Sequence, residues 1–277
     1  MSDETIDPES TVGFPSRQPL RFDVLTLFPG MFAGPMSESI IRRAQDDARI
    51  ELHLHDIREW TTDRHRTVDD TPYGGGAGMV MRPDPLVTAV ESLPVQGVRR
   101  VLLMAAGGRP FDQAMARALS DAGQVVLLCG HYEGIDERVV EILVAEPVSV
   151  GDYVLTGGEL PAMIVIDAVS RLVEGVIDHE SIEQESFDDG LVEYPHYTRP
   201  AVFRDLPVPE ILLSGHHARI AAWRRDQSLR RTVAVRPDLI RNAILHGRLS
   251  AKEETLARDL LDGFDPEDGR GPTNRGR

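Results

Sequence analysis

Hydrophobic and polar positions in the first two thirds of the chain change repeatedly between two patterns. Short apolar or alternating runs predict strands at 22–28, 50–57, 100–104 and 124–129. Segments with helical spacing of apolar residues predict helices at 37–48, 85–92 and 112–119. The run from Val125 to Cys129 is continuously apolar, which is typical of a strand buried on both faces. Alternating strands and helices predict a parallel α/β sheet.

The block from Val148 to Arg171 joins a short apolar strand, a polar loop and a nearly apolar helix. The loop contains glycines at 151, 157 and 158. Glycine lets the main chain approach a ligand closely, because no Cβ atom intrudes. The sequence therefore predicts that this loop binds a ligand.

The helix that follows begins at Glu159 and carries Pro161 in its first turn, where the missing N–H costs nothing. Its polar residues Asp167, Arg171 and Glu174 are spaced so that they share one stripe. Such a stripe on an apolar helix indicates a face toward a cleft or a partner subunit. The alternative is a buried crossover helix with an Asp167–Arg171 pair at the surface.

The pattern changes after residue 176. Segment 177–198 is acidic and poor in apolar residues, which indicates a linker between an α/β domain at 20–176 and a second domain at 199–264. The second domain shows only helical patterns: one helix after Ser214-Gly215 to about Val235, and another from Pro237 to about His246. A third, starting at a capping box of Ser250 and Glu253, is expected to reach Leu261. The polar ends, 1–19 and 265–277, are expected to be disordered tails.

Composition places the protein among ordinary globular chains, with 41% hydrophobic and 27% charged residues. The net charge of −15 is unevenly distributed, since seven arginines lie between Ile211 and Arg241. Cys129 is the sole cysteine, which excludes an internal disulfide. The first residues lack the layout of a signal peptide, and no apolar run approaches the length of a membrane helix, so a cytoplasmic protein is expected.

The common catalytic fingerprints are absent from the chain. Gly74-Gly75-Gly76-Ala77-Gly78 fits neither the dinucleotide nor the phosphate-loop motif, which argues against a Rossmann site. The histidines lack the spacing of metal ligands, so no metal site is assigned. No G-x-S-x-G elbow is present, which argues against a serine hydrolase.

Three polar segments are candidates for ligand binding. Segment 129–138 leaves the buried strand at the edge where α/β sheets bind ligands, although Glu133 and Asp136 are alternatively helix caps. The charged loop 63–70, followed by the glycine cluster, resembles an anion-binding loop, or is a solvated face. Ser214-Gly215-His216-His217 at a helix start is a phosphate site or a simple N-cap.

Taken together, these motifs resemble one family, the bacterial tRNA (guanine-N1)-methyltransferases (TrmD) of the knotted SPOUT class. The resemblance covers about residues 20–262. It rests on 22–29, 63–70, Tyr73 to Met79, Gly130 to Arg138, the Val148–Arg171 block, Tyr197-Thr198-Arg199-Pro200 and Ser214 to His217.

The resemblance implies a parallel sheet with helices on both faces, a C-terminal trefoil knot in the α/β domain, and a small all-helical C-terminal domain. It implies a homodimer with active sites at the subunit interface. S-adenosylmethionine is the expected methyl donor, and the need for Mg²⁺ is left open. The residues expected to bind the donor are Met104, Ala106, Gly108, Gly130, Glu133, Gly134, Val150, Gly151, Asp152, Tyr153, Val154 and Leu155.

The family methylates guanine N1 just 3′ of the anticodon, at tRNA position 37. N1 carries a proton, so a carboxylate base must remove it, and a cation must stabilise the charge that develops toward O6. The resemblance assigns Arg171 as the cation. The family base is an aspartate before Ser-Phe in the linker, contributed to the partner subunit's site. This chain has Glu185 at that position, so Asp178 and Asp188 are alternative bases. A second departure is Ala105-Ala106-Gly107-Gly108 in place of Ser-Pro-Gln-Gly.

The basic second domain is the expected tRNA-binding surface. The residues assigned to tRNA are Ser214, Gly215, His216, His217, Arg219, Arg224 and Arg225, with Arg230 and Arg231 nearby. Two other functions stay open at this stage. One is a knotted methyltransferase that acts on a different RNA, and the other is an RNA-binding relative with impaired catalysis.

Overall fold

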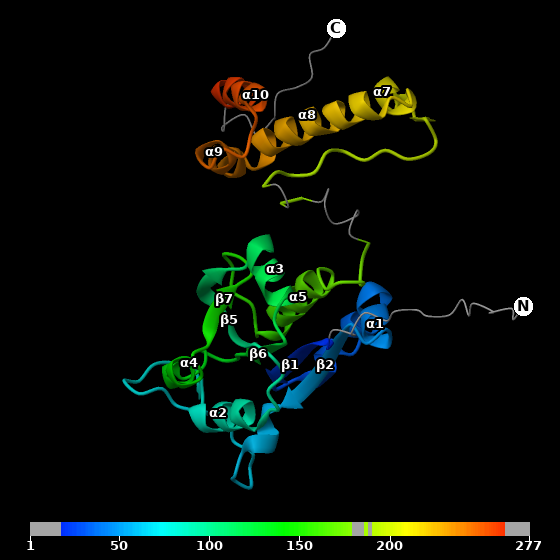
Figure 1. The fold of residues 1–277 in the computed structure, drawn as a ribbon. Coiled ribbons are helices and arrows are strands. Elements are labelled where there is room, and N and C mark those ends of the chain that lie inside the picture. The colour runs from blue at the N-terminus through cyan, green and yellow to red at the C-terminus, as the bar shows by residue number, and fades with distance from the viewer. Residues whose placement is uncertain (1–17, 179–185, 188–189, 264–277) are drawn as a thin grey trace, which may run out of the picture. The chain divides into compact units, whose positions relative to one another are not determined.

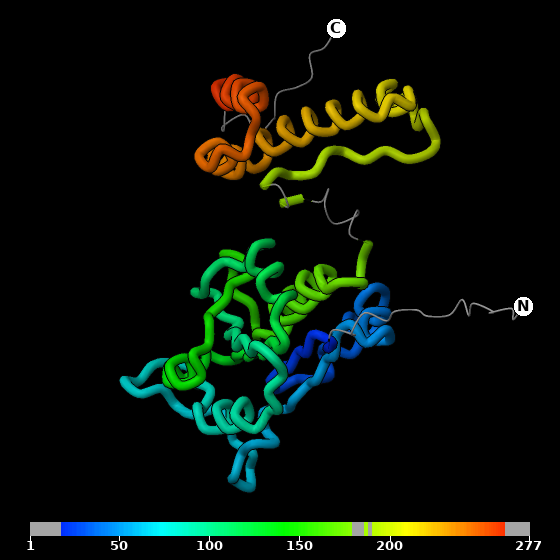
Figure 2. Tube along the Cα trace, viewed as in Figure 1, coloured from blue at the N-terminus to red at the C-terminus, as the bar shows by residue number. Residues whose placement is uncertain are grey.

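The computed structural model describes residues 18–178, 186–187 and 190–263 of the chain. The chain divides into two compact units, Met1–Ile177 and Asp178–Arg277, and each is described by itself. Figure 2 traces the course of the chain through both units, from blue at the N-terminus to red at the C-terminus. Of the segments expected as tails, only Gln18 and Pro19 belong to the described residues.

The first unit is built on a five-stranded sheet in which every pairing is parallel (Figure 1). The strand order is β2-β1-β6-β5-β7. The strands are β1 (Leu20–Thr26), β2 (Ile50–Asp56), β5 (Arg99–Pro110), β6 (Gln124–Cys129) and β7 (Glu146–Ser149). The predicted parallel α/β sheet is confirmed, and β6 is buried along its whole length, as its continuous apolar run predicts.

Strand β5 continues beyond the predicted end at residue 104. Val148 of β7 pairs first with Met104 and then with Arg109, so the intervening Ala105–Gly108 segment bulges out of the pairing between β5 and β7. The apolar pattern stops at this segment because its residues are small. The sequence therefore gave no sign that the backbone rejoins the sheet after the bulge.

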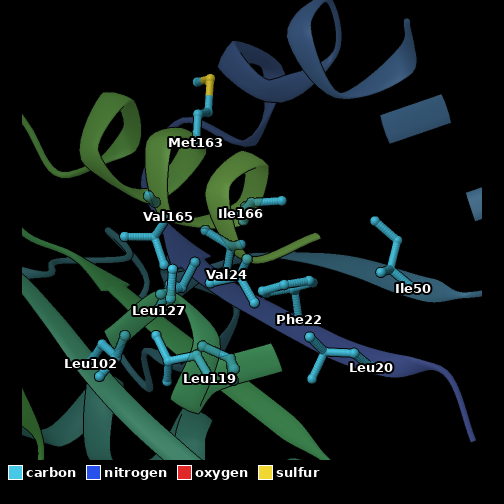
Figure 3. Packing of buried hydrophobic residues seen from close by; sticks show 14 of the residues in the cluster. Leu20, Phe22, Val24, Ile50, Leu102, Leu119, Leu127, Met163, Val165 and Ile166 are labelled. Atoms are coloured by element: carbon cyan, nitrogen blue, oxygen red, sulfur yellow. The ribbon is translucent and has the colours of Figure 1, made fainter. Parts of the chain in front are cut away.

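Helices cover both faces of the sheet. Helices α1 (Ser39–Asp46), α3 (Gln113–Ser120) and α5 (Glu159–Ser170) contribute to the core on one face. Figure 3 shows the centre of that core, where Val165 and Ile166 of α5 lie over Phe22, Val24 and Leu127 of the sheet. On the side of α5 that faces away from this core, Leu160 and Ile164 are exposed.

The opposite face packs against α2 (Pro83–Ser92) and α4 (Glu137–Leu143), with Leu25, Leu86, Leu128 and Val139 in its core. Short connections complete the unit. They are the 3₁₀ helices η1 (Pro29–Phe32), η2 (Pro35–Ser37) and η3 (Ile57–Trp60), and the antiparallel pair β3 (Asp69–Asp70) and β4 (Val80–Met81).

The second unit contains α7 (Glu210–Leu213), α8 (His217–Val235), α9 (Pro237–Leu245) and α10 (Ala251–Asp262). The capping box of Ser250 and Glu253 at the start of α10 is confirmed. The expectation of helices alone is wrong in one detail, since β8 (Val202–Phe203) and β9 (Leu206–Pro207) form a small hairpin. Leu191 is buried with Leu229 and Val233, so packing of this unit includes part of the segment expected as linker.

A buried carboxylate joins three strands of the sheet. The side chain of Asp23 on β1 accepts hydrogen bonds from Arg21 (2.7 Å), from His55 of β2 (2.8 Å) and from Gln124 of β6 (2.7 Å). Burial alone would raise the pKa of Asp23, but the hydrogen bonds from His55, Arg21 and Gln124 outweigh it and hold the pKa well below its usual range. The ionised form of Asp23 therefore stabilises the fold.

We expect Asp23→Asn to lower the free energy of unfolding by about 1–3 kcal/mol at pH 7. Because the folded pKa is lowered, this stabilisation is fully present above the unfolded-state pKa of about 3.9 and is lost as pH falls toward the folded value. The deficit should therefore shrink below about pH 4, as measured by urea unfolding at pH 7 and pH 3. Asp46→Asn, which breaks an exposed pair with Arg42, is the control. An equal deficit at both pH values would contradict the assignment.

Candidate active site

A cavity of about 360 Å³ lies at the carboxyl ends of β5, β6 and β7. It is lined by residues 103–107 of β5, by 130–135 after β6, and by Pro161 with the loop that leads from β7 into α5. These segments converge because the carboxyl ends of parallel strands meet at one edge of the sheet. The volume is in the range of sites that bind small molecules.

Ten of the residues expected to bind the methyl donor line this cavity: Met104, Ala106, Gly130, Glu133, Gly134, Val150, Gly151, Tyr153, Val154 and Leu155. Gly108 and Asp152 do not line it. A Cβ atom at position 108 would lie 2.5 Å from the carbonyl carbon of Pro147, so Gly108 serves the close packing of β5 on β7. The side chain of Asp152 is exposed to solvent.

Several lining residues were not assigned individually to the donor, although they lie in the predicted segments, among them His131, Tyr132, Ser149 and Thr156. Each adjoins a predicted residue, so the contiguity of the motifs was the available signal. In an irregular loop, however, the sequence does not show which side chains turn toward a ligand and which turn to solvent.

The loop before α5 returns to the end of β6. The amide of Gly158 donates to the carbonyl oxygen of Gly130 over 2.9 Å. A Cβ atom at position 158 would lie only 2.6 Å from Cα of Cys129, so any larger residue would push the two backbones apart. At position 158 glycine therefore serves the close approach of two main-chain segments, which closes one wall of the cavity, and the approach of this loop to a ligand stays a prediction.

Residues around β4 are hydrogen-bonded to segment 130–136, most of which lines the cavity. Main-chain hydrogen bonds run from Met81 N to Gly134 O (2.9 Å), from Asp136 N to Met81 O (3.0 Å) and from Glu133 N to Met79 O (3.0 Å). The carboxylate of Asp136 caps α4 by accepting from Arg138 N. The capping alternative is thus correct for Asp136, whereas Glu133 lines the cavity.

The charged loop 63–70 is organised by one carboxylate. Asp63 accepts hydrogen bonds from the main-chain amides of His65 and Thr67, and from the hydroxyl of Thr67. These hydrogen bonds lower the pKa of Asp63. Arg64, His65 and Arg66 are exposed, which is compatible with both of the functions considered for this loop.

The predicted stripe of Asp167, Arg171 and Glu174 is wrong at its end, because α5 stops at Ser170 and Glu174 lies in the turn that follows. The α5 stripe that the structure shows consists of Leu160, Ile164, Asp167 and Arg171, and it is only partly covered. Leu160, Ile164 and Asp167 are exposed, and Arg171 is half-buried at the C-cap. Pro161 lines the cavity, and Arg171 lies ten residues further along, which corresponds to roughly 15 Å at about 1.5 Å per residue. Within one chain the structure therefore does not bring Arg171 into the cavity.

A hydrogen-bonded network that the sequence did not predict borders the cavity. Glu159, which is 1% exposed, accepts from the hydroxyl of Thr26 over 2.6 Å, and its other carboxylate oxygen lies 2.7 Å from Nε2 of His131. The sequence identified Glu159 only as the first residue of a helix. Its partners stand 133 and 28 positions away, and no local pattern indicates such contacts.

Cys129 is the last residue of β6, two residues before His131 of this network, and it is completely buried. Burial and, to a lesser extent, the carboxylate of Glu159 raise the pKa of its thiol well above the usual range. Because thiolates are the reactive species, we expect no reaction with a thiol reagent such as dithionitrobenzoate in the native protein. In denaturant, one thiol per chain should react. Prompt reaction of the native protein would show that this end of β6 is accessible.

The residues expected to bind tRNA fall into two groups in the second unit. His216, His217 and Arg219 are exposed at the start of α8. The segment Ser214–His217 does start α8, with His216 at the N-cap position and no cap from its side chain. The Ser214 hydroxyl donates to Ile211 O at the end of α7 and accepts from the His216 amide over 3.3 Å. Gly215 joins the two helices with a φ of 71°.

The second group is engaged within the unit. The guanidinium of Arg224 lies 4.8 Å from the centre of the Tyr194 ring. Arg225 donates to Glu253 over 2.6 Å, and Arg230 pairs with Asp226 at 2.8 Å. Although burial alone would raise the pKa of Glu253, hydrogen bonds from Arg225 and Ser250 lower it to about 2. Part of the positive charge of α8 is thus balanced by neighbouring carboxylates.

Two of the candidate bases, Glu185 and Asp188, lie outside the described residues. The third, Asp178, is exposed. Among the residues that the structure describes, no group of three His, Cys, Asp or Glu side chains is placed to hold a metal ion. No helix within the described ranges combines the length and the hydropathy of a membrane span.

Comparison with known proteins identifies the family. The model of the tRNA (Guanine-1)-methyltransferase TrmD family matches residues 20–242. The chain is 59% identical over 239 residues to the tRNA (guanine-N(1)-)-methyltransferase of Chloroflexus aggregans. These 239 residues cover 86% of this chain and 94% of the relative. The chain is 56% identical to the enzyme of the same name from Chloroflexus aurantiacus, over 91% of this chain and 100% of the relative. The chain therefore belongs to the tRNA (guanine-1)-methyltransferase family, a family of enzymes.

Proposed function

We propose that this protein transfers a methyl group from S-adenosylmethionine to N1 of the guanine at tRNA position 37, immediately 3′ of the anticodon. Membership of the family supports a tRNA substrate and the guanine-N1 reaction. The observation that carries the proposal is the cavity at the carboxyl edge of the sheet, which is lined by ten of the residues expected to bind the donor. The names of the relatives do not favour the alternative of another RNA.

The cavity suits S-adenosylmethionine in size and chemistry. Its walls combine glycine-rich main chain with apolar side chains of Met104, Ile135 and Val148, which suit the adenosyl group. The polar groups of Glu133 and Thr156 are available to its charged end. When bound, the donor supplies an electrophilic methyl group on a sulfonium sulfur.

The protein must then make guanine N1 nucleophilic. We assign removal of the N1 proton to Glu185, at the position where the family has an aspartate before Ser-Phe, with Asp178 and Asp188 as alternatives. We assign stabilisation of the charge that develops toward O6 to Arg171. A glutamate is about as basic as an aspartate but one methylene longer, so its carboxylate must approach N1 from a slightly different direction.

The α5 stripe supports a homodimer with active sites at the subunit interface. Leu160 and Ile164 leave an apolar surface beside the cavity, although one face of α5 is already buried. In a two-fold pairing of α5 with its copy about the middle of the stripe, Leu160 of one subunit would lie opposite Arg171 of the other. This arrangement would bring each Arg171 to the cavity of the partner subunit.

We further propose that the chain forms the trefoil knot of the SPOUT class. The return of Gly158 to the end of β6, after β7 has paired beside β5, is the local geometry that such threading requires. The helical unit is assigned to tRNA binding through its exposed basic residues, including His216, His217 and Arg219. Since tRNA is the substrate, the proposed location is the cytoplasm.

The test is methyl transfer to a defined tRNA transcript. Purified protein, transcript and labelled S-adenosylmethionine should yield 1-methylguanosine on nucleoside analysis, and a transcript with adenine at position 37 should yield none. Another methylated nucleoside would favour a different RNA reaction. Binding of the donor by calorimetry without any turnover would favour the impaired relative.

A further inference from the structure

The network around Glu159 links three segments that border the cavity. Thr26 ends β1, His131 belongs to the loop after β6, and Glu159 begins α5. The hydroxyl of Thr26 donates to Glu159 over 2.6 Å and itself accepts from the amide of Phe28 over 2.9 Å. The second carboxylate oxygen of Glu159 lies 2.7 Å from His131, so the carboxylate bridges the other two residues.

The ring of His131 is held on several sides. The Phe28 ring meets it edge-on at 4.9 Å between centroids. On another side, Gly157 packs against the His131 ring so closely that a Cβ atom at this position would collide with the ring. The His131 side chain is 15% exposed and lines the cavity, whereas Glu159 is 1% exposed and does not. The side chains of Glu159 and Thr26 therefore do not touch a ligand in the cavity, and His131 is the lining side chain to which they are hydrogen-bonded.

The loop that carries His131 adopts a conformation that needs external support. Tyr132 has a φ of 60°, in the left-handed region that disfavours residues with a Cβ atom, and Gly134 has a φ of 135°. Tyr132, Glu133 and Gly134 all line the cavity. The hydrogen bond from His131 to the buried carboxylate anchors the residue immediately before the strained one. Loss of this anchor would let the loop relax and change the shape of the cavity.

We propose that Thr26 and Glu159 are positioning residues for methyl-donor binding, which act by holding His131 in the cavity wall. This inference rests on the proposed placement of S-adenosylmethionine in the cavity. The network lies on the donor side of the site and includes none of the residues assigned to the base, the cation or tRNA. Its removal should therefore weaken donor binding without weakening tRNA binding.

The decisive variants are Thr26→Val, which removes the hydroxyl at similar volume, and Thr26→Ser, which keeps it. We expect Thr26→Val to raise the dissociation constant for S-adenosylmethionine about tenfold to a hundredfold in calorimetry, and Thr26→Ser to restore it. The affinity for tRNA and the single-turnover rate at saturating donor should change by less than about threefold. A purely structural role would instead lower all three together with thermal stability.

His131→Gln provides a second measurement, because the glutamine amide can still donate toward Glu159. We expect its donor affinity to lie between those of the wild type and His131→Ala. His53→Gln is the matched control, since His53 forms a similar pair with Glu51 at 3.3 Å on an exposed part of β2. This control should bind the donor as the wild type does.

Ala106→Trp tests whether the donor binds in this cavity, independently of the positioning role of Thr26 and Glu159. The large side chain would fill the cavity from an exposed position on its wall. Wild-type donor affinity in Ala106→Trp would overturn the placement and the positioning role with it. Loss of donor binding in Ala106→Trp, combined with unchanged affinity in Thr26→Val and His131→Ala, would overturn the positioning role alone.

Discussion

Replacement of Glu185 by alanine is expected to slow single-turnover methylation of tRNA by about 10²–10⁴-fold, the usual contribution of a general base. The reason is that guanine N1 is protonated and cannot attack the methyl group until its proton is removed. The affinity for S-adenosylmethionine should stay at the wild-type value, because the residues assigned to the donor lie elsewhere in the chain. Quenched-flow or manual sampling with labelled donor measures the rate.

Two matched variants decide among the candidate carboxylates. Asp178→Ala and Asp188→Ala remove the alternative bases, and each is expected to keep the rate within about threefold of the wild type, far from the loss of a general base. Glu185→Asp restores the carboxylate of the family and should retain most of the rate. If Glu185→Ala turned over at the wild-type rate and Asp178→Ala did not, the base would be Asp178.

The regular elements of this fold could be predicted because each carries a local signal. The apolar run of β6 and the capping box of α10 match the structure to within a residue. The bulge of β5 could not be predicted because its residues are small. The hairpin of β8 and β9 could not be predicted because its strands are too short to show a periodic pattern. The sequence thus indicates where elements form better than how their edges are shaped.

The candidate site was predictable to the extent that its residues are contiguous in motifs. The segments around Gly130 and Gly151 were found because glycine clusters follow buried strands. The contact of Thr26 with Glu159 spans 133 positions and depends on how β1 lies beside the start of α5. Such tertiary contacts between single polar residues leave no trace in a local pattern.

The position of Arg171 bears on how the active site is assembled. Its place at the far end of α5 puts it roughly 15 Å along the helix from Pro161 in the cavity wall. In its own chain Arg171 is not among the residues that line the cavity. If Arg171 stabilises the charge on O6, we expect it to do so at the cavity of the partner subunit, through the proposed two-fold pairing of the α5 stripes.

Arg171→Ala is accordingly expected to lower the turnover number about 10²–10³-fold, the usual cost of losing one charge-stabilising group, with donor affinity unchanged. Arg171→Lys should recover only part of the rate, because it keeps the charge but loses the planar fork. Mixing Arg171→Ala with Ala106→Trp tests the partner assignment. In a mixed dimer, the intact cavity of one subunit faces the intact Arg171 of the other, so one of the two active sites works. About half of the dimers in a random mixture are mixed, and the mixture should therefore regain about a quarter of wild-type activity. A mixture as inactive as its two components would place Arg171 in its own chain's site.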